Sequence, residues 1–154
     1  KSEIERILTS FGSNQNFTLD DKFSDDCHLV SSSLLIGDWS GISFEFASAF
    51  CRPVLFINTR QKDFGALAAD QKDSMPCFEN HARERYGIVI ESDEIANIVS
   101  YVDQIKANYQ SLEQKILESR AYDFYNIGSV AMEMLIAITE IFDADEISEV
   151  KFGR

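Results

Sequence analysis

Two short apolar runs, separated by a segment with helical periodicity, constrain the fold of this chain more than any other feature. The runs cover residues 33–37 and 53–57, and residues 41–50 between them place apolar side chains at helical spacing. Short runs without polar alternation are typical of strands that are buried on both faces. Two strands joined by one helix lie parallel, because the helix returns the chain to the edge where the first strand began. The sequence therefore predicts a βαβ unit.

The rest of the chain is predicted to be mostly helical. The expected helices cover residues 3–11, 25–31, 78–86, 92–107, 111–125 and 130–142, and short strands are expected at 17–19 and 87–90. Residues 58–76 lack a clear period and are predicted to form a long loop. This loop follows the second strand directly, so it should lie at the carboxyl edge of the sheet, where parallel sheets bind their ligands.

These elements predict a Rossmann-like, three-layer α/β/α fold with a mainly parallel sheet. The sheet should be incomplete, because three or four strands are expected where a doubly wound domain has about six, and no strand precedes the first helix. No repeat or linker divides the chain, so residues 1–154 are predicted to be a single domain, with residues 108–154 as a helical tail. The missing first strand and the start at Lys1 predict a piece of a longer protein.

Charge and cysteine content argue against several classes of function. The formal net charge is −12, which disfavours nucleic acids and anionic membrane surfaces as partners. No segment approaches the about twenty apolar residues that span a bilayer. The cysteines Cys27, Cys51 and Cys77 form no CxxC pair and no metal-ligand spacing, so neither a disulfide framework nor a metal site is expected. Free thiols predict a cytoplasmic location.

The turn after the first apolar run is the predicted functional site. It reads Gly37-Asp38-Trp39-Ser40-Gly41 and leads into the first crossover helix. A helix start at this edge presents unpaired N–H groups and a positive dipole end to an anion. Ser40 has a hydroxyl to donate, Gly41 allows close approach of a ligand, and Glu45 one turn later can accept from ribose hydroxyls. The alternative is that Asp38 or Ser40 only caps the helix.

Basic residues elsewhere extend this prediction to a phosphate-binding site. Arg60 and Lys62 follow the second strand, at the same edge of the sheet. His81, Arg83 and Arg85 come after the long loop and could bring positive charge to a phosphate in an otherwise acidic chain. The alternative is that all five are solvated or pair with neighbouring acids, such as Glu84 or Asp73 beside Arg85.

The same region resembles a known enzyme family. Residues 34–47, LLIGDWSGISFEFA, and residues 52–56, RPVLF, are similar to the CDP-glycerol glycerophosphotransferases. Those enzymes make teichoic-acid-type polymers on a GT-B-type glycosyltransferase scaffold. In them a strand runs into a D-Y-S-S or D-Y-S-G turn, followed by a helix with an acid, then R/K-P and an apolar strand. Here Trp39 replaces the usual Tyr, and Gly41 stands where many members have Ser.

The resemblance implies that the chain is most of the C-terminal, nucleotide-binding half of a GT-B-type transferase. Asp38, Trp39, Ser40, Gly41 and Glu45 match the donor-binding segment, so a nucleotide-diphosphate donor such as CDP-glycerol is the implied ligand, with no other cofactor. The catalytic residues stay unknown, because the family's base and acceptor site lie largely in an N-terminal domain. That domain is the implied partner, it would place the enzyme at the inner face of the membrane, and this part alone should be inactive.

Two rival functions remain open at this point. A nucleotide-sugar epimerase-like enzyme uses the same scaffold, with a Ser-Gly turn and a downstream acid. Alternatively, the chain is a non-catalytic interaction domain whose tail helices pack against a partner domain. Residual apolar surface on residues 130–142 would favour the second of these rivals.

Overall fold

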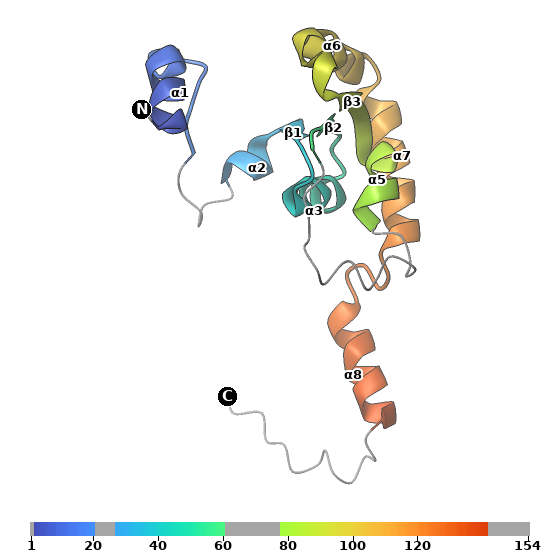
Figure 1. The fold of residues 1–154 in the computed structure, drawn as a ribbon. Coiled ribbons are helices and arrows are strands. Elements are labelled where there is room, and N and C mark those ends of the chain that lie inside the picture. The colour runs from blue at the N-terminus through green and yellow to red at the C-terminus, as the bar shows by residue number, and fades with distance from the viewer. Residues whose placement is uncertain (1, 21–26, 61–77, 142–154) are drawn as a thin grey trace.

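The computed structural model describes residues 2–20, 27–60 and 78–141 (Figure 1). The elements in these ranges are, in chain order, α1 (Glu3–Phe11), α2 (Cys27–Ser31), β1 (Leu35–Gly37), α3 (Gly41–Phe50), β2 (Val54–Asn58), α5 (Phe78–Tyr86), β3 (Gly87–Glu91), the 3₁₀ helix η1 (Ser92–Asn97), α6 (Ile98–Ala107), α7 (Tyr109–Asp123) and α8 (Val130–Ile141). The described part is therefore a mixed α/β protein in which helices predominate.

The three strands form one parallel sheet in the order β1-β2-β3. Leu35 of β1 lies opposite Val54 of β2, and Val54 lies opposite Gly87 of β3. The predicted βαβ unit is thus confirmed, with α3 as its crossover helix. The carboxyl ends of all three strands meet at one edge, as an incomplete Rossmann-like fold requires.

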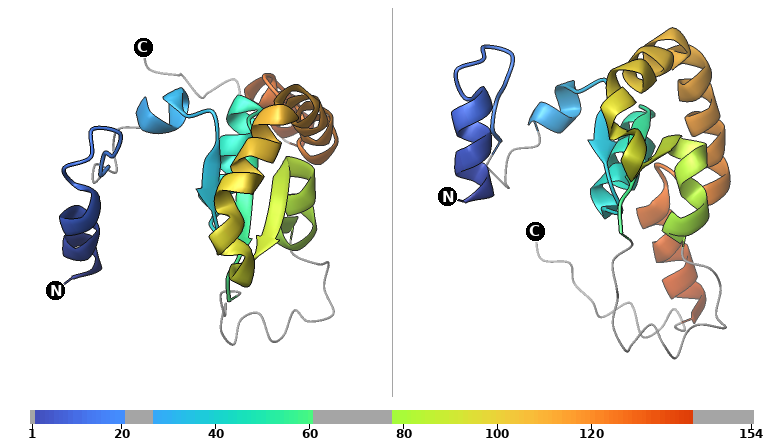
Figure 2. Two further views of the ribbon diagram at one scale, coloured as in Figure 1. Left: turned by 90° about the horizontal axis from the view of Figure 1, so that it is seen from above. Right: turned by 45° about the horizontal axis from the view of Figure 1, so that its top comes forward.

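Alternate residues of the central strand β2 face two separate apolar clusters. Val54 and Phe56 pack with α3, α5 and Ile116 of α7. Leu55 packs with Ile90 of β3 and with Ile105 of α6 on the other face. Since strand side chains alternate between faces, the sheet is the middle of three layers. Figure 2 shows these layers from two further directions.

Two predicted elements differ from the structure. Residues 17–19 form no strand, and the ring of Phe17 instead lies 5.9 Å from the ring of Phe11 at the end of α1. The helix predicted over residues 92–107 begins as the 3₁₀ helix η1, and α6 starts only at Ile98. The N-cap of η1 is Glu91 rather than Ser92, because Glu91 and Glu94 form a capping box.

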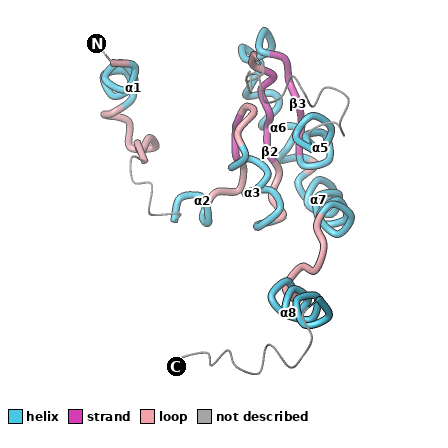
Figure 3. Tube along the Cα trace, turned by 60° about the horizontal axis from the view of Figure 1, so that its bottom comes forward, coloured by secondary structure: helices cyan, strands magenta, loops and turns pink. Residues whose placement is uncertain are grey.

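The predicted helical tail divides into two unlike helices. Helix α7 contributes Ile116 to the core, whereas no residue of α8 is buried. Figure 3 shows α8 continuing past the end of α7, away from the sheet. In the described ranges no helix has the length and apolar character needed to cross a membrane. The predicted loop at 58–76 falls outside the described residues from position 61 onward, and so does Cys77.

Candidate functional site

The turn between β1 and α3 leaves the start of the helix without a side-chain cap. Ser40 occupies the N-cap position with extended backbone angles, φ −82° and ψ 136°, but its side chain makes no capping hydrogen bond. The first N–H groups of a helix have no partner within the helix, so they need one from elsewhere. This geometry argues against the interpretation that Ser40 serves only as a cap, and it leaves the hydroxyl available to a ligand.

Two glycines border the turn for different reasons. A Cβ atom at Gly37 would overlap with the side-chain oxygen of Ser43, which is fully buried beneath it. A Cβ atom at Gly41 would meet nothing within 4 Å. A side chain at Gly37 would therefore displace the buried Ser43 hydroxyl, whereas Gly41 faces open space. No packing contact explains Gly41, and close approach of a ligand would explain it.

Trp39 connects the turn to the end of β2. Its indole Nε1 donates a hydrogen bond to the carbonyl oxygen of Thr59, at 2.9 Å. The guanidinium carbon of Arg83, from α5, lies 4.1 Å from the centroid of the Trp39 ring. Guanidinium groups stack on indole faces through cation–π attraction. The indole N–H and the ring face of Trp39 are therefore both engaged at the carboxyl edge of the sheet.

Arg83 is buried at this edge, with 4% of its surface exposed. It donates to Asn58 Oδ1 at 3.0 Å and to the carbonyl oxygen of Ile57 at 3.1 Å. Asn58 in turn donates to Glu91 Oε1 at 2.9 Å. A polar chain thus runs from α5 across the end of β2 to the end of β3.

The charge of Arg83 has no direct counter-ion in the part of the chain that the structure describes, because all three ion pairs there join other residues. Burial lowers the pKa of Arg83, and the more distant carboxylates of Asp38 and Glu91 act in the opposite direction. A guanidinium group keeps its proton at neutral pH in proteins, so Arg83 remains charged. The edge of the sheet therefore holds a buried cation.

The predicted site residues fall at this edge. Asp38, Trp39, Ser40 and Gly41 form the turn, and Glu45 is exposed one helical turn further along α3. Arg60 follows β2 and is exposed, and Lys62 lies outside the described residues.

The three basic residues of α5 do not act together. Arg83 contacts Trp39 of the turn. Arg85 pairs with Asp123 of α7 at 2.7 Å, and the carbonyl oxygen of His81 accepts from Arg85. The alternative interpretation named Glu84 or Asp73 as partners, and Asp73 lies outside the described residues. Arg85 is thus committed to the contact between α5 and α7.

Sequence reasoning missed Asn58 and Glu91. Both are the last residues of their strands, yet the predicted strands ended one residue earlier, at 57 and 90. A polar residue directly after an apolar run in two neighbouring strands is the signal that would have found them, since both ends meet at one edge.

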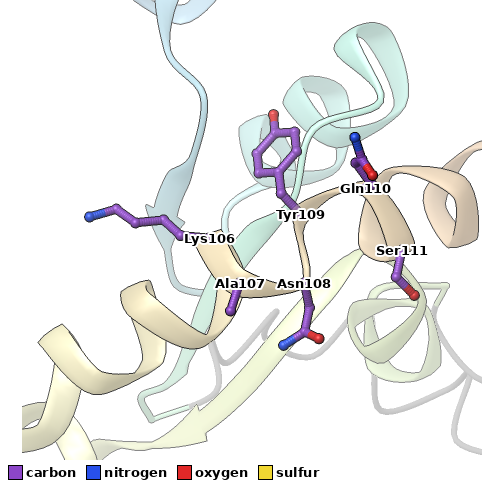
Figure 4. A pocket seen from close by; sticks show the side chains of 6 residues that line it. All are labelled: Lys106, Ala107, Asn108, Tyr109, Gln110 and Ser111. Atoms are coloured by element: carbon purple, nitrogen blue, oxygen red, sulfur yellow. The ribbon is translucent and has the colours of Figure 1, made fainter.

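A hollow elsewhere in the molecule is a weaker candidate. It measures about 550 Å³ and is lined by six consecutive residues, 106–111, at the junction of α6 and α7. Tyr109 of this stretch donates to the carbonyl oxygen of Ser33, just before β1, so the hollow lies where the strands begin. Figure 4 shows its side chains projecting in different directions rather than toward a common point. Nothing converges there to hold a ligand.

The described residues contain no cluster of three or more side chains suited to a metal ion. The chain matches no protein-family model, no curated protein and no solved structure. The fold and the site together define the structural class of the protein. It is a mixed α/β protein with a small, open parallel sheet and a polar strand-to-helix turn at the carboxyl edge of that sheet.

Proposed function

We propose that this chain is the donor-binding part of a transferase that moves glycerol phosphate or a sugar-like unit from a nucleotide-diphosphate donor. The observation that carries the proposal is the uncapped start of α3, which directly follows Trp39, and the ring of Trp39 contacts a buried arginine at the carboxyl edge of a parallel sheet. Parallel sheets bind nucleotides at this edge, with phosphate groups at helix starts. The resemblance of residues 34–47 to CDP-glycerol glycerophosphotransferases supports the same function and a GT-B-type parent.

The donor diphosphate would sit at the first turn of α3. Backbone N–H groups and the positive end of the helix dipole would hold it, and the Ser40 hydroxyl would donate to a phosphate oxygen. Glu45, one turn further, would accept from a ribose hydroxyl. The same helix start would stabilise the negative charge of the departing nucleotide phosphate in the transition state. The catalytic base and the binding site for the acceptor, a cell-envelope polymer or glycan, would come from another domain of the parent protein.

Calorimetric titration with CDP-glycerol, CDP and UDP tests this function. The Ser40→Ala and Gly41→Val double variant should bind at least about tenfold more weakly, because it loses a donor and blocks the approach. The Gly41 Cβ position is open, so the fold should persist. Ala49→Val, at an exposed position near the other end of α3, controls for adding a branched residue to this helix. A folded wild-type chain that binds none of the three nucleotides would count against the proposal.

A non-catalytic interaction domain is the second candidate, and the surface of α8 favours it. This helix has two acidic residues, Glu133 and Glu140, and none of its residues is buried. Its large apolar side chains are between 41% and 76% exposed, namely Val130, Met132, Met134, Leu135, Ile136, Ile138 and Ile141. Exposed apolar surface of this kind is typical of contacts with a partner domain.

Light scattering and binding of an apolar dye test the second candidate. A double variant, Leu135→Glu with Ile138→Glu, should bind less dye and associate less at high concentration than the wild type. Equal dye binding and equal mass for both proteins would show that α8 is not an interaction surface.

A further inference from the structure

Two buried side-chain atoms lack a hydrogen-bond partner in the described part of the chain, and both flank the β1–α3 turn. They are the Ser43 hydroxyl oxygen and Nε of Arg83. Ser43 lies in the first turn of α3 beneath Gly37, and Arg83 stacks on Trp39. Buried polar groups in folded proteins are nearly always paired, so these two atoms mark the surroundings of the turn as polar and incompletely satisfied.

The charge of Arg83 is the stronger of the two signals, because no carboxylate of the described residues contacts it directly and Asp38 and Glu91 act on it only from a longer distance. A buried charge is costly unless an opposite charge or a full set of hydrogen bonds accompanies it. Arg83 has only neutral partners, the amide oxygen of Asn58 and the carbonyl oxygen of Ile57, and its third nitrogen has none. The chemistry that satisfies such a group is an anion.

The position of the guanidinium determines where that anion would sit. Its carbon lies 4.1 Å from the centroid of the Trp39 ring and 5.1 Å from that of Phe56. Trp39 directly precedes the N-cap residue Ser40. Trp39 thus contacts the buried cation through its ring and adjoins the uncapped helix start through its backbone, so both bring positive potential to the turn.

We propose that Arg83 is a positioning residue for the diphosphate group, holding Trp39 at the turn and supplying the positive charge that draws the anion to the start of α3. This inference rests on the proposed function and extends it to a residue outside the turn. Two consequences follow. The affinity lost on removing Arg83 should grow with the charge of the ligand, and ligand binding should change the emission of Trp39, the single tryptophan of the chain.

The test titrates inorganic pyrophosphate, CDP, CMP and cytidine against the full chain, with Trp39 fluorescence and calorimetry as readouts. Arg83→Met should lower the affinity for pyrophosphate and for CDP by at least about tenfold and the affinity for CMP by less. The affinity for cytidine should change by less than about twofold. Arg83→Lys keeps the charge and should retain affinity for CDP within about threefold. Arg6→Met, which removes an exposed charge on α1, is the matched control and should leave every affinity unchanged.

The outcomes separate this inference from the proposed function. One outcome is that the wild type binds CDP and that a folded Arg83→Met variant loses affinity equally for all four ligands, or for none of them. The role of Arg83 is then refuted, while donor binding stands. Binding of pyrophosphate without any nucleotide would refute the donor function and keep the anion site. Absence of any wild-type response would refute both. If Arg83→Met does not fold, Arg83→Lys decides, because a loss of CDP affinity well beyond threefold in a folded protein contradicts a role based on charge.

Discussion

Arg83 and Arg85 lie two positions apart on α5, yet their surroundings differ completely. Arg85 donates through two nitrogens to the carboxylate of Asp123, whose side chain is only 5% exposed, and Tyr86 donates to the same carboxylate at 2.9 Å. Among the described residues, Arg83 bonds to two neutral oxygens and lies over the rings of Trp39 and Phe56. At the residue scale, the charge of Arg85 is paired with a carboxylate, whereas Nε of Arg83 has no hydrogen-bond partner among the described residues. We therefore expect stability to respond to Asp123 and Tyr86, and ligand affinity to respond to Arg83.

The hydroxyl of Tyr86 gives a prediction about pH. Burial and the hydrogen bond to Asp123 raise the pKa of Tyr86 above its usual value. Above pH about 10 the unfolded chain loses this proton while the folded chain keeps it, so Tyr86 makes the free energy of unfolding fall as the pH rises. Tyr86→Phe should cost about 1–2 kcal/mol at pH 7 and make the decline shallower. Urea unfolding at pH 7 and at several pH values above about 10 measures both effects, and equal slopes with pH in that range would contradict the assignment.

At the element scale, the start of β3 is set by close approach to β2. Gly87 lies opposite Val54 in the parallel register, and a Cβ atom there would overlap with the Val54 carbonyl oxygen. The strand therefore begins at a glycine because the neighbouring backbone occupies the space of a side chain. Immediately before it, Tyr86 ends α5 inside the core. The short connection between α5 and β3 depends on both features.

Gly87→Ala should separate β3 from β2 and lower the free energy of unfolding by about 2–3 kcal/mol, as expected for overpacking at a buried site. Gly41→Ala is the matched control, because a Cβ atom at Gly41 meets nothing within 4 Å. It should change stability by less than about 0.5 kcal/mol. Chemical denaturation of the two variants compares these values directly, and similar losses for both would show that the close approach at Gly87 does not limit stability.

At the scale of the whole molecule, burial does not follow the hydrophobicity of the helices. Helix α8 is rich in Ile, Met and Leu but buries no residue, whereas α7 contains many charged and polar residues and still places Ile116 in the core. Helix α7 also packs against α5 through the pairing of Arg85 with Asp123. The sheet and α7 therefore form one packed unit, and α8 adds a surface to it.

An Ile→Ala substitution should lower the free energy of unfolding much more in α7 than in α8. Ile116→Ala removes a side chain with 0% exposure and should cost about 2–5 kcal/mol of unfolding free energy. Ile136→Ala acts on a side chain that is 44% exposed and should cost less than about 0.5 kcal/mol. Thermal and urea unfolding of the two variants provide the comparison. A large loss for Ile136→Ala would mean that α8 is part of the folding unit.

The sequence by itself determined the elements that carry a local period. The two apolar runs, the crossover helix at 41–50 and the turn from Gly37 to Gly41 were all predicted, because burial on both faces of a strand and on one face of a helix leaves a pattern in neighbouring residues. Residues 17–19 show the limit of this reasoning, since the short run Phe17-Thr18-Leu19 was expected to be a strand and forms none.

Only the tertiary structure decided which polar groups meet at the site. Trp39 donates a hydrogen bond to Thr59, 20 positions away, and Arg83 donates to Asn58, 25 positions away. Asn58 donates to Glu91, 33 positions away. Such contacts depend on the order and register of the strands, and no spacing along the chain records them. The turn was therefore predictable, whereas the choice of Arg83 over its basic neighbours was not, because that choice depends on which face of α5 packs against the edge of the sheet.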